Sequence, residues 1–507
     1  MRKVKKLLGL LLAAVMVLAM GVPTFAANEF TITAPDNEHT YEIYQVFTGD
    51  YSEGILSNVK WGKNGTGTPG AAVEQTVLNA LTAVNSASDK AQLDVIEDYV
   101  KLDSDDAFGT VGKGSAQSLT VPGGYYLIKD KDDSVSGNDS YTPYIVKVVG
   151  NVTIAPKSDV PEFEKKVQDI NDSTDTTVSD WQDTADHDIG DKVNFLLKGT
   201  VADNYDNYDT YKFVFHDQES AGLTFQSSSV VVKVGDTKID SSYYSVVTSE
   251  LSDGCTFEIR FDDLKKIEDA EGNKLVYAGA DITVEYQSEL NENAVIGSAG
   301  NPNTAHLEFS NNPNDEQGGE TGTTPDDTVI VFTFKTIINK VKPVDGEEGK
   351  TEPLAGAAFK LEKLIKGTEG AEDTWELIKE FTADENTTKF EFSGLDDGQY
   401  RLTETATPDG YNTMSPNPFE FTITATHDDE TLTLTGLNGK VITGEVELTF
   451  AANSADGSLS ANVVNQKGST LPETGGMGTT IFYVLGAILV LGAGGLLIAR
   501  RRTDSEK

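Results

Sequence analysis

Apolar and polar residues alternate along most of the chain, which is the pattern of half-buried β-strands. Short runs rich in β-branched and aromatic residues are separated by clusters of Gly, Asn and Asp, which favour turns. Clear runs lie at 211–215, 230–234, 332–338 and 419–424. A helical spacing of apolar residues is found at 71–100. We therefore predict a mainly β protein built from tandem immunoglobulin-like β-sandwiches, with some helix in its N-terminal domain.

Changes in composition predict the domain boundaries. Residues 154–161 form a short extended connector with two prolines, and residues 311–327 are polar, rich in Gly and contain Pro. We expect domains at 27–156, 157–314 and 328–466, with a linker at 315–327 and a separate C-terminal segment at 467–507. The full length of 507 residues leaves each domain enough chain to bury its own core.

Three polar residues of the predicted third domain, Lys340, Glu404 and Asn465, fall on the apolar faces of their predicted strands. Side chains alternate between the two faces of a strand. The residues that share a face are Phe332, Phe334, Ile338 and Lys340; Tyr400, Leu402 and Glu404; and Ala461, Val463 and Asn465. A lone buried Lys or Glu is costly, but these groups can neutralise one another by proton transfer. They form either a buried ion pair with a hydrogen-bonded amide or a covalent bond between amine and amide.

The middle domain shows the same pattern around Lys165, Asp217 and Asn303, while Lys166 points outward. The residues that share a face are Phe163, Lys165 and Val167; Tyr211, Phe213, Phe215 and Asp217; and Asn303, Ala305, Leu307 and Phe309. Asp186, Asp188 and Asp191 are alternatives to Asp217 as the acidic partner, and a position in a solvated loop is the default for each acid.

Both ends of the chain carry targeting signals. Residues 1–26 combine basic residues, a short apolar run and a small-residue exit, which predicts a signal peptide rather than an uncleaved anchor. At the other end, residues 479–499 are apolar and long enough to span a bilayer, and Arg500, Arg501 and Arg502 follow them. An ordinary single-pass anchor is one interpretation of this segment.

Charge and cysteine content narrow the classes of partner. The formal net charge is −41 and the acidic residues are spread along the chain, so nucleic acid and anionic membrane surfaces are poor partners. Cys255 is the single cysteine, so an intramolecular disulfide is excluded. Any covalent reinforcement must come from other side chains.

Leu471, Pro472, Glu473, Thr474 and Gly475 directly precede the apolar segment and its basic stop. This order resembles the cell-wall sorting signal (LPXTG) of Gram-positive surface proteins, which a membrane-bound sortase cleaves between threonine and glycine. The resemblance implies a thioester between Thr474 and the sortase cysteine, resolved by an amine. We expect a secreted protein, held briefly at the membrane and then anchored covalently to cell-wall peptidoglycan.

Residues 354–361 and 392–411 look like the Cna-B, or SpaA-type prealbumin-like, domain, and residues 161–172, 189–193 and 211–225 resemble the Cna-A-like domain of major (backbone) pilins. In this family, lysine and asparagine side chains join in an isopeptide bond assisted by an acid. The resemblance assigns the bonds to Lys340–Asn465 with Glu404, and to Lys165–Asn303 with Asp217. Burial lowers the lysine pKa and raises that of the acid, so we expect the protonated acid to hydrogen-bond the asparagine carbonyl while the neutral amine attacks the amide and releases ammonia.

The amine that accepts Thr474 is assigned from a partial match to a motif. Backbone pilins use a lysine in a Tyr-Pro-Lys motif, and the matching stretch here is Ala155-Pro156-Lys157, with alanine in place of tyrosine. A solvated linker lysine is the alternative for Lys157. If another amine is used, the protein would be anchored singly to peptidoglycan.

Enzyme and cofactor sites are not indicated. The motifs of phosphate-binding loops, serine hydrolases and zinc proteases are missing, and the five histidines are scattered, with His216 and His306 on outward faces. We expect no metal and no cofactor. The sequence predicts the shaft subunit of a fimbrium, with a polymerising sortase, identical subunits and minor pilins as partners. The alternative is a monomeric adhesin or minor pilin that binds a host surface ligand.

Overall fold

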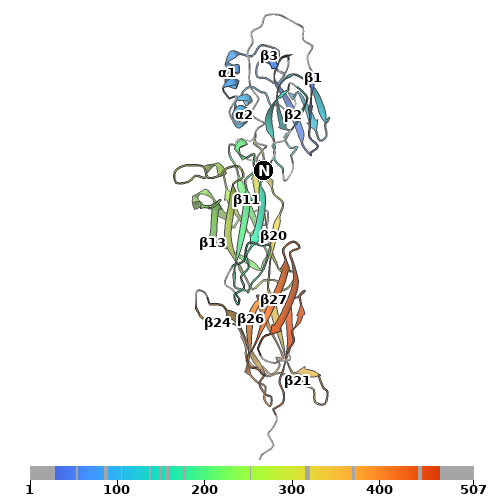
Figure 1. Cartoon of the computed structure of the whole chain (residues 1–507), viewed down its shortest axis with the longest axis vertical. Helices are drawn as coiled ribbons and strands as arrows, with labels where there is room; N and C mark the ends of the chain where they lie inside the picture. Colours follow the sequence, from blue (N-terminus) through green and yellow to red (C-terminus); the bar gives the residue numbers. More distant parts are fainter. Residues whose placement is uncertain are drawn as a thin grey trace, which may run out of the picture.

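The computed structural model describes residues 29–468, apart from 53–54, 85–88, 104–105, 136–138, 149, 155–158, 175–177, 252, 314–319, 368–370 and 444–447. Three groups of sheets follow one another along the long axis of the molecule (Figure 1). No helix within these residues is both long enough and apolar enough to cross a membrane. The predicted signal peptide, sorting signal and apolar segment, and Lys157, lie outside the described residues.

The N-terminal group contains two sheets and two helices. One sheet has the order β5-β1-β8, and the other has the order β3-β2-β6-β7 with β4 beside β2. The elements are β1 (Glu29–Thr33), β2 (Thr40–Ser52), β3 (Ile55–Trp61), α1 (Gln75–Ala83), α2 (Asp89–Glu97), β4 (Gly109–Gly112), β5 (Ser118–Pro122), β6 (Gly124–Asp130), β7 (Pro143–Val148) and β8 (Val152–Thr153). The helices confirm the helical pattern predicted for this region.

Alternation along β2 explains why this sheet is covered on both sides. Tyr41 and Ile43 are buried with residues of the small sheet, such as Ile32, whereas Tyr44 is buried with Val77 of α1. A strand that is apolar on both faces needs a layer on each.

The middle group is a sandwich of two larger sheets. One has the order β14-β13-β17-β11-β9, and the other has the order β10-β20-β18-β12-β16-β15 with β19 beside β18. The strands are β9 (Glu162–Val167), β10 (Thr184–Asp186), β11 (Lys192–Thr200), β12 (Phe213–Glu219), β13 (Leu223–Val234), β14 (Thr237–Lys238), β15 (Ser245–Val247), β16 (Phe257–Phe261), β17 (Asp281–Leu290), β18 (Asn301–Ser310), β19 (Thr321–Thr323) and β20 (Asp327–Phe332). Short 3₁₀ turns lie at Tyr205–Asn207, Ser241–Tyr243 and Leu264–Lys266.

The C-terminal group is a second sandwich. Its sheets have the orders β22-β21-β30-β29, with β25 beside β21, and β24-β23-β26-β27-β28. The strands are β21 (Phe334–Pro343), β22 (Thr351–Pro353), β23 (Ala358–Ile365), β24 (Thr374–Phe381), β25 (Lys389–Leu395), β26 (Gly398–Ala406), β27 (Phe419–Asp428), β28 (Thr433–Val441), β29 (Ala451–Asn453) and β30 (Ser458–Val464). This group and the middle one confirm the mainly β fold.

The predicted boundary at residue 328 is wrong. We expected 315–327 to be a linker and the third domain to begin at 328. Instead β20 pairs with β18 and β10 in the middle sandwich. Only Thr333, which is fully buried, separates β20 from β21. The described part of this segment, residues 320–327, therefore belongs to the middle group, where it contributes β19 and the first residue of β20, and the passage to the last group is almost continuous β-strand.

Charged residues cross the junction between the middle and C-terminal groups. The buried Lys363 amine of β23 contacts Asp188 at 2.5 Å and Asp172 at 3.3 Å, both from the middle group, and Asp396 at 3.0 Å. His427 of β27 contacts Asp186 at 3.0 Å. Lys363, Asp396 and Asp186 are buried, and the junction is held by these ion pairs as well as by the short connection.

Candidate internal crosslink sites

The middle sandwich brings Lys165, Asp217 and Asn303 together between its sheets. Lys165 comes from β9 in one sheet, and Asp217 of β12 and Asn303 of β18 come from the other. All three side chains are fully buried. Because β12 and β18 are neighbours in antiparallel register, with Asp217 opposite Ala305, Asn303 lies one side-chain repeat away from Asp217 on the same face.

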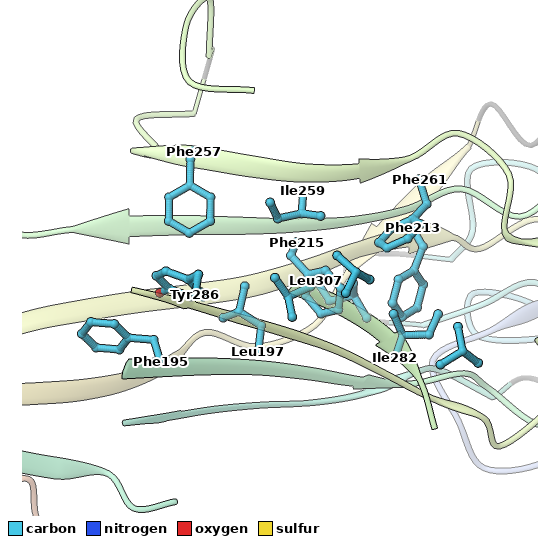
Figure 2. Packing of buried hydrophobic residues seen from close by; sticks show 14 of the residues in the cluster. Phe195, Leu197, Phe213, Phe215, Phe257, Ile259, Phe261, Ile282, Tyr286 and Leu307 are labelled. Carbon is cyan, nitrogen blue, oxygen red and sulfur yellow. The ribbon is translucent and has the colours of Figure 1, made fainter. Parts of the chain in front are cut away.

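Tyr286 of β17 completes this site (Figure 2 shows its hydroxyl inside the aromatic core). The Lys165 amine donates to Asp217 Oδ2 at 2.5 Å and to the Tyr286 hydroxyl at 2.8 Å. That hydroxyl donates to Asp217 Oδ2 at 2.7 Å and accepts from Asn303 Nδ2 at 2.9 Å. Tyr286 therefore touches every member of the predicted trio, and the sequence analysis missed it.

The electrostatics of this site favour proton transfer from lysine to aspartate. Burial lowers the pKa of Lys165, and burial also raises the pKa of Asp217. The aromatic rings of Phe195 and Tyr286 lie 5.4 and 5.3 Å from the amine and exclude water. Moving one proton to Asp217 leaves an uncharged amine and an uncharged acid, which suits an apolar interior better than two charges.

The alternative acids are placed elsewhere. Asp186, Asp188 and Asp191 lie toward the C-terminal group, where Asp186 contacts His427 and Asp188 contacts Lys363. Asp217 contacts Lys165 directly. Among the four candidates considered from the sequence, Asp217 is the acid at this lysine.

The C-terminal sandwich brings Lys340, Glu404 and Asn465 together in the same way. Lys340 lies on β21, and Asn465 directly follows β30, the parallel neighbour of β21. The backbone amide of Asn465 donates to the Val341 carbonyl at 3.0 Å, which holds the two residues side by side. Glu404 reaches them from β26 in the opposite sheet, and all three side chains are buried.

The distances centre on one oxygen of Glu404. Its Oε1 lies 3.1 Å from the Lys340 amine and accepts from Asn465 Nδ2 at 2.7 Å. The Lys340 amine and Glu404 Oε1 are close enough to form an ion pair, but the amine is not oriented to donate a hydrogen bond. Oε2 accepts from the backbone amide of Met414 at 2.7 Å, which fixes the carboxylate in place.

The orientation of the Asn465 amide differs from expectation. We expected the acid to hydrogen-bond the amide carbonyl. Instead Nδ2 faces Glu404, and the buried Oδ1 has no hydrogen-bond partner. An ionised carboxylate can only accept, so the amide offers its donor. Once the carboxyl carries a proton, the reversed amide becomes the matched partner.

Burial also lowers the pKa of the Lys340 amine, to about 8. Roughly a tenth of the amine is therefore uncharged at pH 7, far more than in an exposed lysine. Each site thus combines a buried amine, an acid in contact with it and an asparagine amide, which are the groups required for amine–amide exchange.

Two of the five histidines lie together in the fold. The five histidines looked scattered along the sequence, yet His216 and His306 are directly opposite each other on β12 and β18. Their rings stack with centroids 4.8 Å apart. The register of two strands far apart in sequence produced this pair.

Comparison with known proteins assigns these sandwiches. Residues 189–313 match the family model of the Gram-positive pilin backbone subunit 2, Cna-B-like domain, and residues 339–438 match the SpaA prealbumin-like fold domain. Residues 463–505 match the LPXTG cell wall anchor motif. The chain therefore carries the domains of Gram-positive backbone pilins. The family model that matches the middle domain of this pilin describes a Cna-B-like domain, whereas we expected a Cna-A-like domain.

Relatives of this pilin include the trypsin-resistant surface T6 protein of Streptococcus pyogenes serotype M6, which is 25% identical over 431 residues and covers 72% of each chain. Similar solved structures include the T6 backbone pilin of that serotype (17% identity, TM-score 0.48, 87% of this chain and 98% of the other). Another is the major pilin SpaD of Corynebacterium diphtheriae (18% identity, TM-score 0.46, 88% and 99%).

The domain set defines the role and location of this pilin. It is a structural subunit of a pilus shaft on the cell surface. Its LPXTG motif anchors it covalently to the cell wall.

Proposed function

We propose that the subunits are joined head to tail by a sortase and that each subunit is welded internally by two Lys–Asn isopeptide bonds. The sortase cleaves after Thr474 in Leu471–Gly475 and transfers the Thr474 carbonyl to Lys157 of the next subunit. The internal bonds join Lys340 to Asn465 and Lys165 to Asn303. The observation that carries the proposal is the burial of both lysines against an acid and an asparagine amide.

Each internal crosslinking reaction needs only the lysine, the acid and the asparagine of its own site. The uncharged amine attacks the asparagine side-chain carbonyl carbon, so that an N–C bond forms and the bond to Nδ2 breaks. The acid gives its proton to Nδ2, the attacking nitrogen gives one proton back to the carboxylate, and ammonia is released. Each site reacts once and on its own chain. This is why we assign the pilin a structural role and no turnover of an external substrate.

The two bonds would protect the shaft against tension in different ways. In the C-terminal domain the bond links β21 to the end of β30, so a pulling force bypasses the intervening strands. In the middle domain the bond would tie the two sheets together, and β20 would carry force onward from its place between β10 and β18. The hold of β20 in the middle sandwich therefore depends on its hydrogen bonds to β10 and β18 and not on the crosslink.

The proposed partners follow from this assembly. A membrane-bound sortase, identical subunits and minor pilins act during polymerisation, and peptidoglycan receives the finished shaft. In the sequence, Lys157 follows β8 and precedes β9.

The test is the behaviour of Lys157→Ala on the cell surface. Wild-type cell walls should yield ladders that resist boiling in detergent, and Lys157→Ala should yield a single wall-anchored band. Lys131→Ala, an exposed lysine of the N-terminal domain, is the matched control and should keep the ladder. Ladders in Lys157→Ala would assign the acceptor elsewhere. A single band in the wild type would favour the alternative, a monomeric wall-anchored adhesin or minor pilin with a host ligand.

A further inference from the structure

The outer face of the middle sandwich carries a cluster of metal-binding side chains. His216 and His306 form a directly opposed pair on β12 and β18, and their rings are nearly parallel at 11°. The ligand atoms of His216, His306 and Asp253 all lie within 4.8 Å of one another. Two imidazoles and a carboxylate at such spacing can contact one ion.

A turn before β16 adds Asp253 and Cys255 to this pair. Asp253 Oδ2 lies 2.6 Å from His216 Nδ1, and the Cys255 sulfur lies 3.6 Å from the same nitrogen. Gly254 has a φ of +86°, a conformation that turns the chain so that both side chains face the histidine. The turn is fixed to β12 by the Thr256 amide, which donates to the Asp217 carbonyl at 2.7 Å.

This arrangement does not suit a Cys–His–Asp nucleophile. In such a triad the thiol and the carboxylate occupy opposite nitrogens of the imidazole, so that the ring can relay a proton. Here both groups face Nδ1 of His216. Donors that converge on one point are instead the geometry of a shared cation.

The surroundings favour a cation and orient the histidines. His216 Nε2 lies 3.4 Å from Glu308, and His306 Nδ1 lies 3.1 Å from Asp326. A carboxylate on the second nitrogen commonly holds a metal-binding histidine in position. Glu258 adds a further negative charge 3.7 Å from His216, while Lys212 pairs with Glu308 and Arg260 with Glu258. Together with Asp253, four acids therefore surround the two histidines, and two permanent cations, Lys212 and Arg260, lie among them.

We propose that His216, His306, Asp253 and Cys255 bind one divalent transition-metal ion of the zinc class. Two imidazole nitrogens, one thiolate and one carboxylate make a four-ligand set that zinc accepts, and sulfur and nitrogen donors disfavour calcium and magnesium. The Cys255 thiol releases its proton to solvent when the metal binds. His216 is 12% exposed and His306 26%, so the ion can reach the site from solvent.

The test uses the exported chain, that is, the chain without its predicted signal peptide, and without an affinity tag. The protein is first treated with chelator and then titrated with metal ions. Calorimetry with Zn²⁺ should show one saturable equivalent, and Co²⁺ should give the thiolate charge-transfer absorption. Cys255→Ser should remove that absorption, and His306→Gln should weaken Zn²⁺ binding by at least about tenfold, the loss typical even of outer-shell changes. Asp236→Asn, an exposed carboxylate of the same domain, is the control and should leave both signals unchanged.

Three results would overturn the site. They are the lack of a saturable equivalent in the wild type, Zn²⁺ binding that is unchanged in His306→Gln, and Co²⁺ binding without a thiolate absorption. Cys255→Ser preserves the size of the side chain, so it remains informative if His306→Gln folds poorly. The circular dichroism of each variant checks its fold.

Discussion

Lys340→Met tests what the C-terminal crosslink contributes to stability. Methionine is close to lysine in length and carries no charge, so it fills the space at this buried position without leaving a cavity. Without the amine no isopeptide bond can form in this domain. The substitution therefore isolates the bond from the packing around it.

The expected loss is large. A bond from Lys340 to Asn465 closes a loop of roughly 125 residues, which stabilises by about 5 kcal/mol if the chain-entropy relation for disulfides applies. For a domain of this size, such a change lowers the melting temperature by on the order of 20 °C. Lys340→Met also leaves the buried Glu404 without its cationic partner, so the measured loss includes the cost of that unpaired carboxyl as well as the loss of the bond.

Differential scanning calorimetry of the exported chain measures the effect, together with its intact mass. We expect the C-terminal domain to melt earlier in Lys340→Met, and the variant to show one ammonia loss from its sequence mass where the wild type shows two. Glu404→Ala should give the same single loss. Lys335→Met, on the same strand but on its outer face, is the matched control. Equal melting of wild type and Lys340→Met, or two ammonia losses in the variant, would refute the reasoning.

Three further predictions concern other buried groups. Tyr286→Phe removes the hydroxyl that contacts Lys165, so the middle domain should crosslink more slowly, and a time course of intact mass that matches wild type would contradict this role. Hydrogen bonds to Asp130 and Asp139 raise the pKa of His39 from 6.5 to about 10. Protonated His39 should therefore stabilise the N-terminal domain fully below pH 6.5, and this stabilisation should be lost as the pH rises to about 10. In His39→Gln, the melting temperature of the N-terminal domain should decline less over this pH range. Lys363→Met leaves carboxylates unpaired at the domain junction, so small-angle scattering should show a less rigid rod, whereas an unchanged curve would show that the ion pairs are dispensable.

Alternation along strands correctly predicted the inward positions of the candidate crosslink residues. Lys340, Glu404 and Asn465 each lie at an inward position. Because the domain has one core, polar side chains that point into it are brought together and form hydrogen bonds or ion pairs with one another. The same reasoning placed Lys165, Asp217 and Asn303. The inward face could be derived from local sequence because the side-chain period of a strand does not depend on which strand lies beside it.

Features that depend on strand pairing could not be derived in this way. β20 has the same apolar pattern whether it joins the middle or the last sandwich, and its pairing with β18 decides the matter. Tyr286 is one of many inward aromatics, and only the packing of β17 against β12 and β18 brings it to Lys165. His216 and His306 meet because of the register of two strands about 90 residues apart, which no local pattern records.

The most direct test of the account is the intact mass of the wild-type exported chain, followed by fragmentation. We predict a mass below that of the sequence by two ammonia molecules, with one branched peptide joining Lys165 to Asn303 and another joining Lys340 to Asn465. A chain at its full sequence mass, with all four side chains free, would contradict the claim that burial makes these lysines reactive.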